Sequence, residues 1–281
     1  MFKRVVIKLS GEALAGMEQT KEYVKYFIED TQAMIENHML IDDAFITAET
    51  KKLDKAKLRL RFDDSIISRI ISQIKDIMDI GVEVALVVGG GNFWRGRDSK
   101  EDIDKVRSDQ IGMMATVMNA VYLTDMLEKA GIDSIVLTPV IIGTVTQQFS
   151  KKAALKYMAE KNVVIFAAGT GHPFFSTDTI AAIRTAELEA DALLFAKNVD
   201  GVYDSDPNQN NRAIKLRNIS YRDVIKNNLT VIDTAASAIC EEQKILSIIF
   251  KLDEPDAIVK CVSGNEGEIH KIGTTVTAKY E

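Results

Sequence analysis

The sequence has few cysteines and few histidines for its length. Among 281 residues there are two cysteines, Cys240 and Cys261, and three histidines. The cysteines lie in unrelated surroundings, without the Cys-x-x-Cys spacing that is common in metal sites. This usage argues against a disulfide framework and a structural zinc site, and it is typical of a reducing compartment. We therefore expect a cytoplasmic protein.

Long apolar runs and a strong charge bias are also missing. No apolar run reaches about 18 residues, and the first residues enter a strand pattern without a hydrophobic signal core. Neither export nor membrane spanning is expected. The 35 lysines and arginines against 41 aspartates and glutamates give a net charge of −6, so a general affinity for nucleic acid is not expected either. An anionic ligand would need local basic groups and backbone dipoles.

What is present is a regular alternation of strand and helix patterns. Short β-branched runs alternate with helix-period stretches, which predicts an α/β fold with parallel strands joined by crossover helices. One helix is predicted to begin at residues 63–65, whose side-chain oxygens can cap it, and to end at Gly81. The predicted strands are residues 5–9, 82–88, 134–137, 163–167, 192–196 and 245–250.

A second long helix is predicted at residues 108–129, before Gly131. It carries four of the ten methionines beside small residues, and it is apolar around more than half of its circumference. Such a helix is either deeply buried or faces a partner subunit, and periodicity alone favours neither.

Residues 17–61 differ from the rest of the chain. An amphipathic helix is predicted around Tyr23, Phe27 and Met34, and a run dense in lysine and arginine follows at residues 51–61. Charge runs are usually solvated, so a solvated face is favoured over a dedicated binding patch. We interpret residues 1–281 as a single domain into which this segment is inserted.

The residues after four predicted strands combine glycines with hydroxyl groups, lysines or aspartates. Ligands of open α/β sheets bind beyond the carboxyl ends of the strands, so these segments form the candidate site. The clearest is the triple glycine at residues 89–91, whose backbone N–H groups could meet an anion closely, with Arg95 as a counter-charge. A tight turn after a core strand is the alternative. The four segments are residues 8–11, 89–96, 168–178 and 197–207.

Neither common nucleotide-binding fingerprint is present. Residues 11–16 have the Gly-x-x-x-x-Gly spacing of a P-loop, but Met17 and Glu18 follow where Lys and Ser or Thr are required. After the triple glycine, Trp94 occupies the place of the last glycine of a dinucleotide motif. A Walker-type site and a Rossmann dehydrogenase are both disfavoured.

Lys8 and Asp178 are the most informative charged residues. Lys8 ends an apolar strand, where an unpaired ammonium would be costly, so it must meet an anion or reach solvent. Asp178 follows Ser176 and Thr177 where a helix should start. It is either an ordinary N-cap or a carboxylate that faces Lys8 across the sheet, and one residue can do both.

Five ordered motifs resemble those of the bacterial uridylate kinases, a family within the amino acid kinase superfamily. They are residues 5–14, 89–96, 112–119, 169–178 and 199–207, and the resemblance runs from Phe2 to about Val276 apart from residues 17–61. It implies a three-layer α/β/α sandwich with a mainly parallel sheet, and a cytoplasmic homohexamer built from dimers. In that family the loop after the first motif takes part in activation by GTP. The insertion interrupts this loop here, so GTP and UTP stay open as effectors.

The resemblance also implies a reaction. The γ-phosphoryl group of ATP would pass to UMP by direct in-line transfer with Mg²⁺, giving UDP and ADP for pyrimidine nucleotide biosynthesis. We assign no protein ligand to Mg²⁺, because the phosphates can supply most of its ligands. Carried over by motif, the catalytic residues would be Lys8, Arg95 and Asp178. The ATP-binding residues would be Lys8, Leu9, Ser10, Gly11, Gly91, Arg95, Lys197 or Asn198, Tyr203 and Asp206. The UMP-binding residues would be Gly90, Asp109, Thr170, Gly171, His172, Pro173, Phe174, Phe175, Ser176 and Thr177.

Three other functions compete with this interpretation. A kinase of the same superfamily could act on a carboxylate, a carbamate or an isoprenoid phosphate. A nucleotide-binding or oxyanion-storage protein on the same fold could lack catalysis. Residues 51–61 could bind nucleic acid as a second activity, which the net charge disfavours.

Overall fold

The structure, a computed structural model, describes residues 2–15, 62–94, 103–205, 210 and 212–278. The inserted segment predicted at residues 17–61, together with Arg95 and Asp206, lies outside these ranges. The interpretation of the whole chain as one domain with an insertion therefore stays a prediction.

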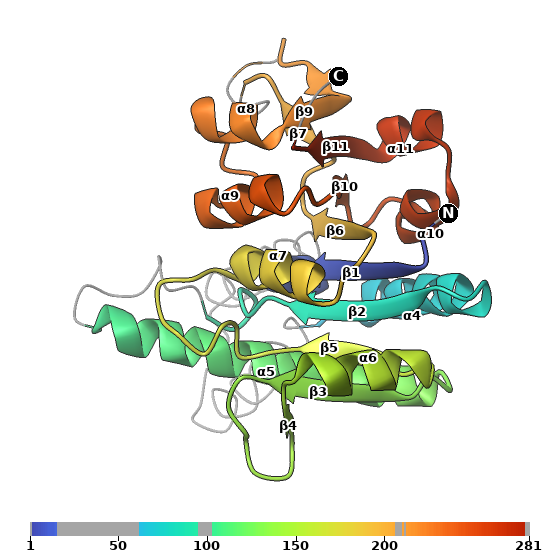
Figure 1. Ribbon diagram of the computed structural model, residues 1–281, viewed down its shortest axis with the longest axis vertical. Coiled ribbons are helices and arrows are strands. Elements are labelled where there is room, and N and C mark those ends of the chain that lie inside the picture. The colour runs from blue at the N-terminus through green and yellow to red at the C-terminus, as the bar shows by residue number, and fades with distance from the viewer. Residues whose placement is uncertain (1, 16–61, 95–102, 206–209, 211, 279–281) are drawn as a thin grey trace, which may run out of the picture.

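A nine-stranded sheet runs through the described residues in the order β4-β3-β5-β2-β1-β6-β10-β11-β9 (Figure 1). Every neighbouring pair is parallel except β10 and β11, which are antiparallel. The strands are β1 (Arg4–Leu9), β2 (Glu83–Val88), β3 (Ser134–Thr138), β4 (Gln147–Gln148), β5 (Val163–Phe166), β6 (Ala192–Lys197), β9 (Asn218–Ser220), β10 (Ser247–Lys251) and β11 (Gly273–Thr277). A separate antiparallel pair joins β7 (Val202–Tyr203) and β8 (Lys215–Leu216). All six predicted strands are confirmed within two residues at each end.

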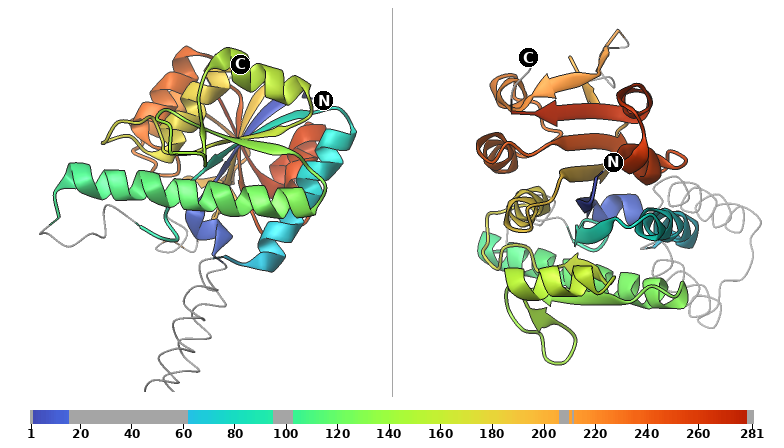
Figure 2. Two further views of the ribbon diagram at one scale, coloured as in Figure 1. Left: turned by 90° about the horizontal axis from the view of Figure 1, so that it is seen from below. Right: turned by 45° about the vertical axis from the view of Figure 1, so that its right-hand side comes forward.

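Helices cover both faces of the sheet (Figure 2). One face is covered by α1 (Gly11–Leu14), α4 (Asp64–Asp79), α5 (Lys105–Lys129), α10 (Ala257–Ser263) and α11 (Glu266–Ile272). The other face is covered by α6 (Lys151–Ala159), α7 (Thr177–Glu187), α8 (Tyr221–Lys226) and α9 (Thr234–Glu242). A separate hydrophobic core fills the space on each side of the sheet. The predicted three-layer α/β/α sandwich is confirmed.

Both predicted long helices form, and their capping residues set where they begin. Asp63 caps α4, because its Oδ1 accepts hydrogen bonds from the backbone N–H groups of Ser65 at 2.9 Å and Ile66 at 3.2 Å. Gly81, at φ +89°, follows the end of this helix in a conformation that suits glycine. The helix predicted at residues 108–129 begins three residues earlier, since Asp104 caps α5 through the N–H of Arg107 at 3.1 Å.

The alternation of side chains along β1 places Lys8 beneath α7. Val5, Ile7 and Leu9 belong to the core on the α4 and α5 side, whereas Val6 belongs to the core on the α7 side. Successive side chains of a strand point to opposite faces, so Lys8 shares the face of Val6.

No helix in the described part of the chain is long and apolar enough to cross a lipid bilayer.

Candidate active site

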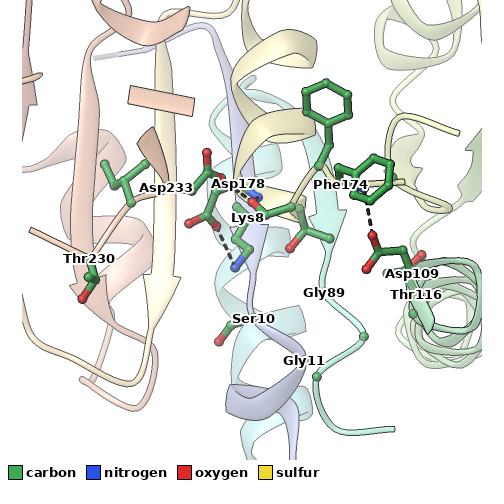
Figure 3. Close-up of a pocket in the computed structure, with 18 of the residues that line it drawn as sticks. Lys8, Ser10, Gly11, Gly89, Asp109, Thr116, Phe174, Asp178, Thr230 and Asp233 are labelled. Atoms are coloured by element: carbon green, nitrogen blue, oxygen red, sulfur yellow. Dashed lines mark hydrogen bonds and ion pairs between the residues drawn. The ribbon is translucent and has the colours of Figure 1, made fainter. Parts of the chain in front are cut away.

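A cleft of about 1000 Å³ opens at the carboxyl ends of the central strands (Figure 3). Its walls come from the segments that follow β1 and β2, from the first half of α5, and from the loop that leads into α7. The chain from α8 to the start of α9 closes another side. Because parallel strands end at the same edge of the sheet, segments far apart in the sequence meet here.

One side of the cleft consists of backbone, and we call Gly11 and the glycines at residues 89–91 the glycine wall. A Cβ on Gly11 would lie 2.6 Å from the backbone nitrogen of Gly91 and 2.8 Å from the carbonyl oxygen of Gly89. A Cβ on Gly90 would lie 2.8 Å from the carbonyl oxygen of Gly112 in α5. At Gly11 and Gly90 the absence of a side chain is therefore required by packing, and it brings backbone groups to the surface of the cleft.

The glycine wall is held from behind by α5. The side-chain nitrogen of Asn119 donates to the carbonyl oxygen of Gly89 at 2.6 Å and to Oδ1 of Asn92 at 2.8 Å. Asn119 is fully buried, so these bonds are shielded from water. The loop after β2 is a tight turn, which is one of the two interpretations that the sequence allowed. The hydrogen bonds of Asn119 hold this turn in place.

Opposite the glycine wall lies the lysine–aspartate cluster, which consists of Lys8, Asp178 and Lys197. Lys8 Nζ lies 2.9 Å from Asp178 Oδ1, and Lys197 Nζ lies 2.7 Å from Asp178 Oδ2. Lys197 also donates to the carbonyl oxygen of Val231. Asp178 therefore faces Lys8 from the first turn of α7, on the same side of the sheet, and the N-cap of α7 is Ser176 instead.

The cluster shifts the pKa values of Asp178 and Lys197. Burial alone would raise the pKa of Asp178, but the two lysines outweigh it and lower this pKa to about 2. Burial lowers the pKa of Lys197, since the attraction of Asp178 only partly offsets it and Lys8 repels a second positive charge. The side chains of the two lysines are 8% and 16% exposed, so both are largely shielded from water, and Lys8 borders the cleft. Two cations and one carboxylate leave a net positive charge beside the glycine wall.

Asp233 fixes the start of α7, which carries Asp178. The hydroxyl of Ser176 accepts from the backbone N–H of Asp178 at 2.9 Å and donates to Asp233. Thr179 Oγ1 donates to the same carboxylate at 3.1 Å. Asp233 also caps α9 by accepting from the N–H of Ala236 at 2.8 Å. Sequence reasoning missed this junction, although an aspartate directly before a helix is a recognisable signal.

The loop that leads into α7 is anchored on α5. Asp109 Oδ2 accepts from the backbone N–H of Phe174 at 2.8 Å (Figure 3). Thr116 Oγ1 accepts from the N–H of Ala168 at 2.7 Å. Phe174 has φ +72°, a conformation that is strained for an aromatic residue, and Lys105 Nζ lies 5.6 Å from the centre of its ring. Asp109, which the resemblance assigns to UMP binding, therefore already holds the backbone of this loop.

The cleft brings together about half of the residues that the sequence singled out. Those that border it are Lys8, Ser10, Gly11, Gly90, Gly91, Asp109, Phe174, Phe175, Ser176, Thr177 and Asp178. Those that do not are Leu9, Thr170, Gly171, His172, Pro173, Lys197, Asn198 and Tyr203. The side chain of Leu9 is buried in the core, and the Tyr203 hydroxyl donates to Asp200 at 2.9 Å. The individual roles of all these residues stay predictions.

Several residues of the cleft were not predicted. They come from the segment between α8 and α9 together with the first turn of α9, which no motif marked, and from the first half of α5. They include Lys105, Ser108, Thr116, Asn228, Thr230, Asp233 and Ser237.

Comparison with known proteins places this fold and cleft in a family. The profile of the amino acid kinase family matches residues 3–251. The UMP kinase of Bacillus anthracis superposes with a TM-score of 0.78 at 29% identity, covering 99% of this chain and 97% of that one. The UMP kinase of Ureaplasma parvum gives 0.73 at 32% identity, covering 99% and 98%. The uridylate kinase of Archaeoglobus fulgidus gives 0.61 at 26%, covering 76% and 93%. The predicted family resemblance is confirmed, and the chain belongs to the amino acid kinase family.

Proposed function

We propose that this protein is a UMP kinase, which transfers the γ-phosphoryl group of ATP to UMP and gives UDP and ADP. Similarity over nearly the whole chain to proteins named as UMP kinases supports this reaction. The observation that carries it is the bridge of Asp178 between Lys8 and Lys197, because it sets Lys8 at the edge of the cleft and holds a second cation on the other oxygen of Asp178. We place the reaction in pyrimidine nucleotide biosynthesis in the cytoplasm.

Phosphoryl transfer requires that the two nucleotides be positioned and that positive charge surround the migrating group. In phosphoryl transfer the migrating group carries its charge on peripheral oxygens, and no covalent nucleophile from the protein is needed. We propose in-line attack by a phosphate oxygen of UMP on the γ-phosphorus of ATP. Lys8 and Lys197 would stabilise the charge on the migrating group, with Arg95 as a third cation. Backbone N–H groups of the glycine wall would hold the phosphates from the other side.

Asp178 would hold the two lysines in position and would not act as a general base. Its pKa of about 2 keeps it ionised at neutral pH, and both of its oxygens face lysines. A carboxylate in this state can hold two ammonium groups at a fixed spacing, whereas it is a poor proton acceptor. The phosphate oxygen of the acceptor needs little activation, because it is already anionic.

Mg²⁺ fits this cleft as a partner of the nucleotide phosphates. The described residues contain no group of three or more His, Cys, Asp or Glu that could hold a metal ion, and the two lysines occupy the oxygens of Asp178. The phosphates themselves would therefore hold Mg²⁺, which would supply further positive charge to the transferring group.

We assign the two nucleotides to opposite parts of the cleft. ATP would lie over Lys8, Ser10 and Gly11, with Gly91 beside its phosphates. The Ser10 hydroxyl borders the cavity and finds no hydrogen-bond partner within the described residues, so it is available to a phosphate. Leu9 could contribute only through its backbone, and Tyr203 and Asp206 would lie near the adenosine. Because Lys197 is engaged with Asp178, we give the adenosine contact to Asn198.

UMP would lie between Gly90, α5 and the loop that leads into α7. Asp109 would face the ribose hydroxyls while it keeps its hydrogen bond to Phe174. Phe174 and Phe175 are 64% and 52% exposed at the cleft, so their rings are available to a base or sugar. The residues at 170–173 would form the outer part of this subsite, and Ser176 and Thr177 would close it.

The remaining expectations concern assembly and regulation. We propose that the chain is a single domain and that it assembles into a homohexamer built from dimers. The segment at residues 17–61 would lie outside the active site as an added interface or regulatory element. GTP and UTP are the effectors to test, because the insertion interrupts the loop that serves GTP in related enzymes.

An acceptor panel tests the proposed reaction. ADP release from ATP and Mg²⁺ is measured with UMP, CMP or carbamate as the acceptor, with the wild-type protein and with Lys8→Ala as a control. We expect release that depends on UMP and is lost in the variant. Release with carbamate alone would assign the chain to another kinase of the family. Nucleotide binding without release would indicate a binding protein.

A further inference from the structure

The loop that leads into α7 contains four residues with positive φ, and two of them are not glycines. Gly169 and Gly171, at φ +55° and +81°, adopt this conformation without steric cost. Ala168, at φ +58°, and Phe174, at φ +72°, each carry a Cβ that disfavours it. Such residues keep this conformation only where the surrounding structure holds them. Two points of the loop therefore need support from outside it.

Side chains of α5 supply both supports. The backbone N–H of Ala168 donates to Thr116 Oγ1 at 2.7 Å. The backbone N–H of Phe174 donates to Asp109 Oδ2 at 2.8 Å (Figure 3). The two acceptors are seven residues apart, so they lie about two turns apart on one side of the helix, and this side borders the cleft. Each strained residue that is not a glycine is thus matched by one acceptor.

The Thr116 hydroxyl is fixed in the direction that suits Ala168. It donates to the carbonyl oxygen of Met113 at 2.6 Å, three residues earlier in the same helix. Because the single proton of the hydroxyl is used there, its oxygen is left to accept from the Ala168 N–H. Thr116 and Ala168 are both 3% exposed, so water cannot readily replace this bond. The bond is therefore a buried and directional contact between α5 and the loop.

We infer that Thr116 is a positioning residue for the acceptor nucleotide, because it fixes the start of the loop while Asp109 fixes its other end. This inference rests on the proposed function, in which residues 170–177 form part of the UMP subsite. Loss of the Thr116 bond would leave a buried N–H group unpaired and would free Ala168 to leave its strained conformation. UMP would then meet a loop in several arrangements, and its binding would include the cost of ordering that loop.

The effect of this bond should be confined to the acceptor side of the cleft. The glycine wall is held by Asn119, and the start of α7 is held by Asp233. These contacts are separate from Thr116, so the ATP subsite and the lysine–aspartate cluster should keep their geometry without its hydroxyl. A raised KM for UMP with an unchanged KM for ATP is therefore the expected signature of the inferred role.

Two substitutions of Thr116 test this role in steady-state kinetics. Thr116→Val keeps the branched shape of the side chain and removes the hydroxyl. KM for UMP should therefore rise about tenfold or more, while KM for ATP changes less than about twofold. Thr116→Ser keeps the hydroxyl, so KM for UMP should return to within about threefold of the wild type.

Thr124→Val is the matched control on the same helix. The Thr124 hydroxyl donates to the carbonyl oxygen of Ala120 in α5 at 3.0 Å, and Thr124 does not border the cleft. This variant loses the same kind of bond within the helix, and it should leave both KM values unchanged. Circular dichroism confirms that each variant is folded. An equal rise of KM for UMP in the two valine variants would overturn the inference.

Hydrogen exchange in the nucleotide-free protein tests the contact itself, whatever the reaction. The amides of residues 168–174 should exchange about tenfold faster or more in Thr116→Val than in the wild type or in Thr124→Val. Unchanged exchange, or faster exchange with an unchanged KM for UMP, would overturn the inference. A wild type without UMP-dependent turnover would overturn the proposed function instead, and the exchange rates would still decide whether Thr116 holds the loop.

Discussion

The two walls of the cleft are held in place by opposite means. The glycine wall has no side chains, and its shape is fixed by close backbone packing, since a Cβ on Gly11 would lie 2.6 Å from the nearest backbone atom. The lysine–aspartate cluster consists of long side chains whose positions are fixed by charge, through ion pairs of 2.9 and 2.7 Å. Both walls border the same cleft at the end of β1.

Substitutions in the two walls should therefore have different effects on stability and on activity. A substitution in the glycine wall adds atoms where there is no space, so its first effect should be on packing and stability. A substitution in the lysine–aspartate cluster removes a charge, so its first effect should be on turnover and on pH dependence. The variants below separate these two kinds of failure.

The largest effect is expected from Asp178→Asn. Removal of one member of a buried ion pair leaves the other charges uncompensated, which typically costs about 3–5 kcal/mol in the free energy of unfolding. The two lysines would also lose their fixed spacing, so kcat should fall on the order of a thousandfold. Denaturant unfolding and steady-state kinetics measure both quantities. Wild-type stability together with wild-type turnover would show that Asp178 neither stabilises the fold nor organises the lysines.

The contribution of Asp178 to stability should depend on pH in a defined direction. Its pKa is about 2 in the folded protein and 3.8 as the ordinary value, so the stabilisation is complete above pH about 4 and is lost as the pH falls through about 2. The difference in unfolding free energy between the wild type and Asp178→Asn should therefore shrink over this range. A difference that stays constant from about pH 5 to about pH 2 would contradict the lowered pKa.

Lys197→Ala and Asn198→Ala should differ in the kinetic constant that they change. Lys197 is held by Asp178, so its loss should lower kcat by about a hundredfold with little change in KM for ATP. Asn198 is exposed after β6 and would contact adenosine, so its loss should mainly raise KM for ATP. A raised KM for ATP in Lys197→Ala, together with a lowered kcat in Asn198→Ala, would instead place Lys197 in the adenosine pocket.

Gly11→Ala tests the glycine wall. The new methyl group would meet backbone atoms of residues 89 and 91, which must move, and such overpacking costs about 1–3 kcal/mol. Gly112→Ala is the matched control, because a Cβ there would lie 3.8 Å from Trp94, an ordinary contact. Thermal unfolding compares the two variants. Equal melting temperatures would show that the wall has space for side chains.

The smallest effect is expected at Asp109. Asp109→Asn keeps an oxygen that can accept from Phe174 but loses the charge, so KM for UMP should rise by less than about tenfold. Asp109→Ala also releases the loop and should raise KM further. An alanine variant no worse than the asparagine variant would show that the bond to Phe174 does not position the acceptor.

Sequence predicted the elements whose signals are local. The six predicted strands are apolar runs long enough to recognise, whereas β4, β7, β8 and β9 have only two or three residues each. The five-residue strand β11 was also not predicted, because Val276 is its single apolar side chain. Lys8 was predictable as a residue in need of an anion, because it ends an apolar strand. Lys197 contacts Asp178 because β6 pairs with β1 in the sheet. The sequence around Lys197 does not indicate this strand order. Asp233 has a local signal as the N-cap of α9, but its contacts with Ser176 and Thr179 depend on the packing of α9 against α7.

The most direct measurement of the central claim is the rate of UDP formation from ATP and UMP, compared between the wild type and Lys8→Ala under saturating substrates. Lys8 meets Asp178 at the end of β1, beside the glycine wall, so the claim depends on its charge. We predict steady UDP formation by the wild type and a kcat lower by on the order of a hundredfold or more in a folded variant. An unchanged kcat in Lys8→Ala, or no UDP formation by the wild type, would contradict the proposed role of the cluster.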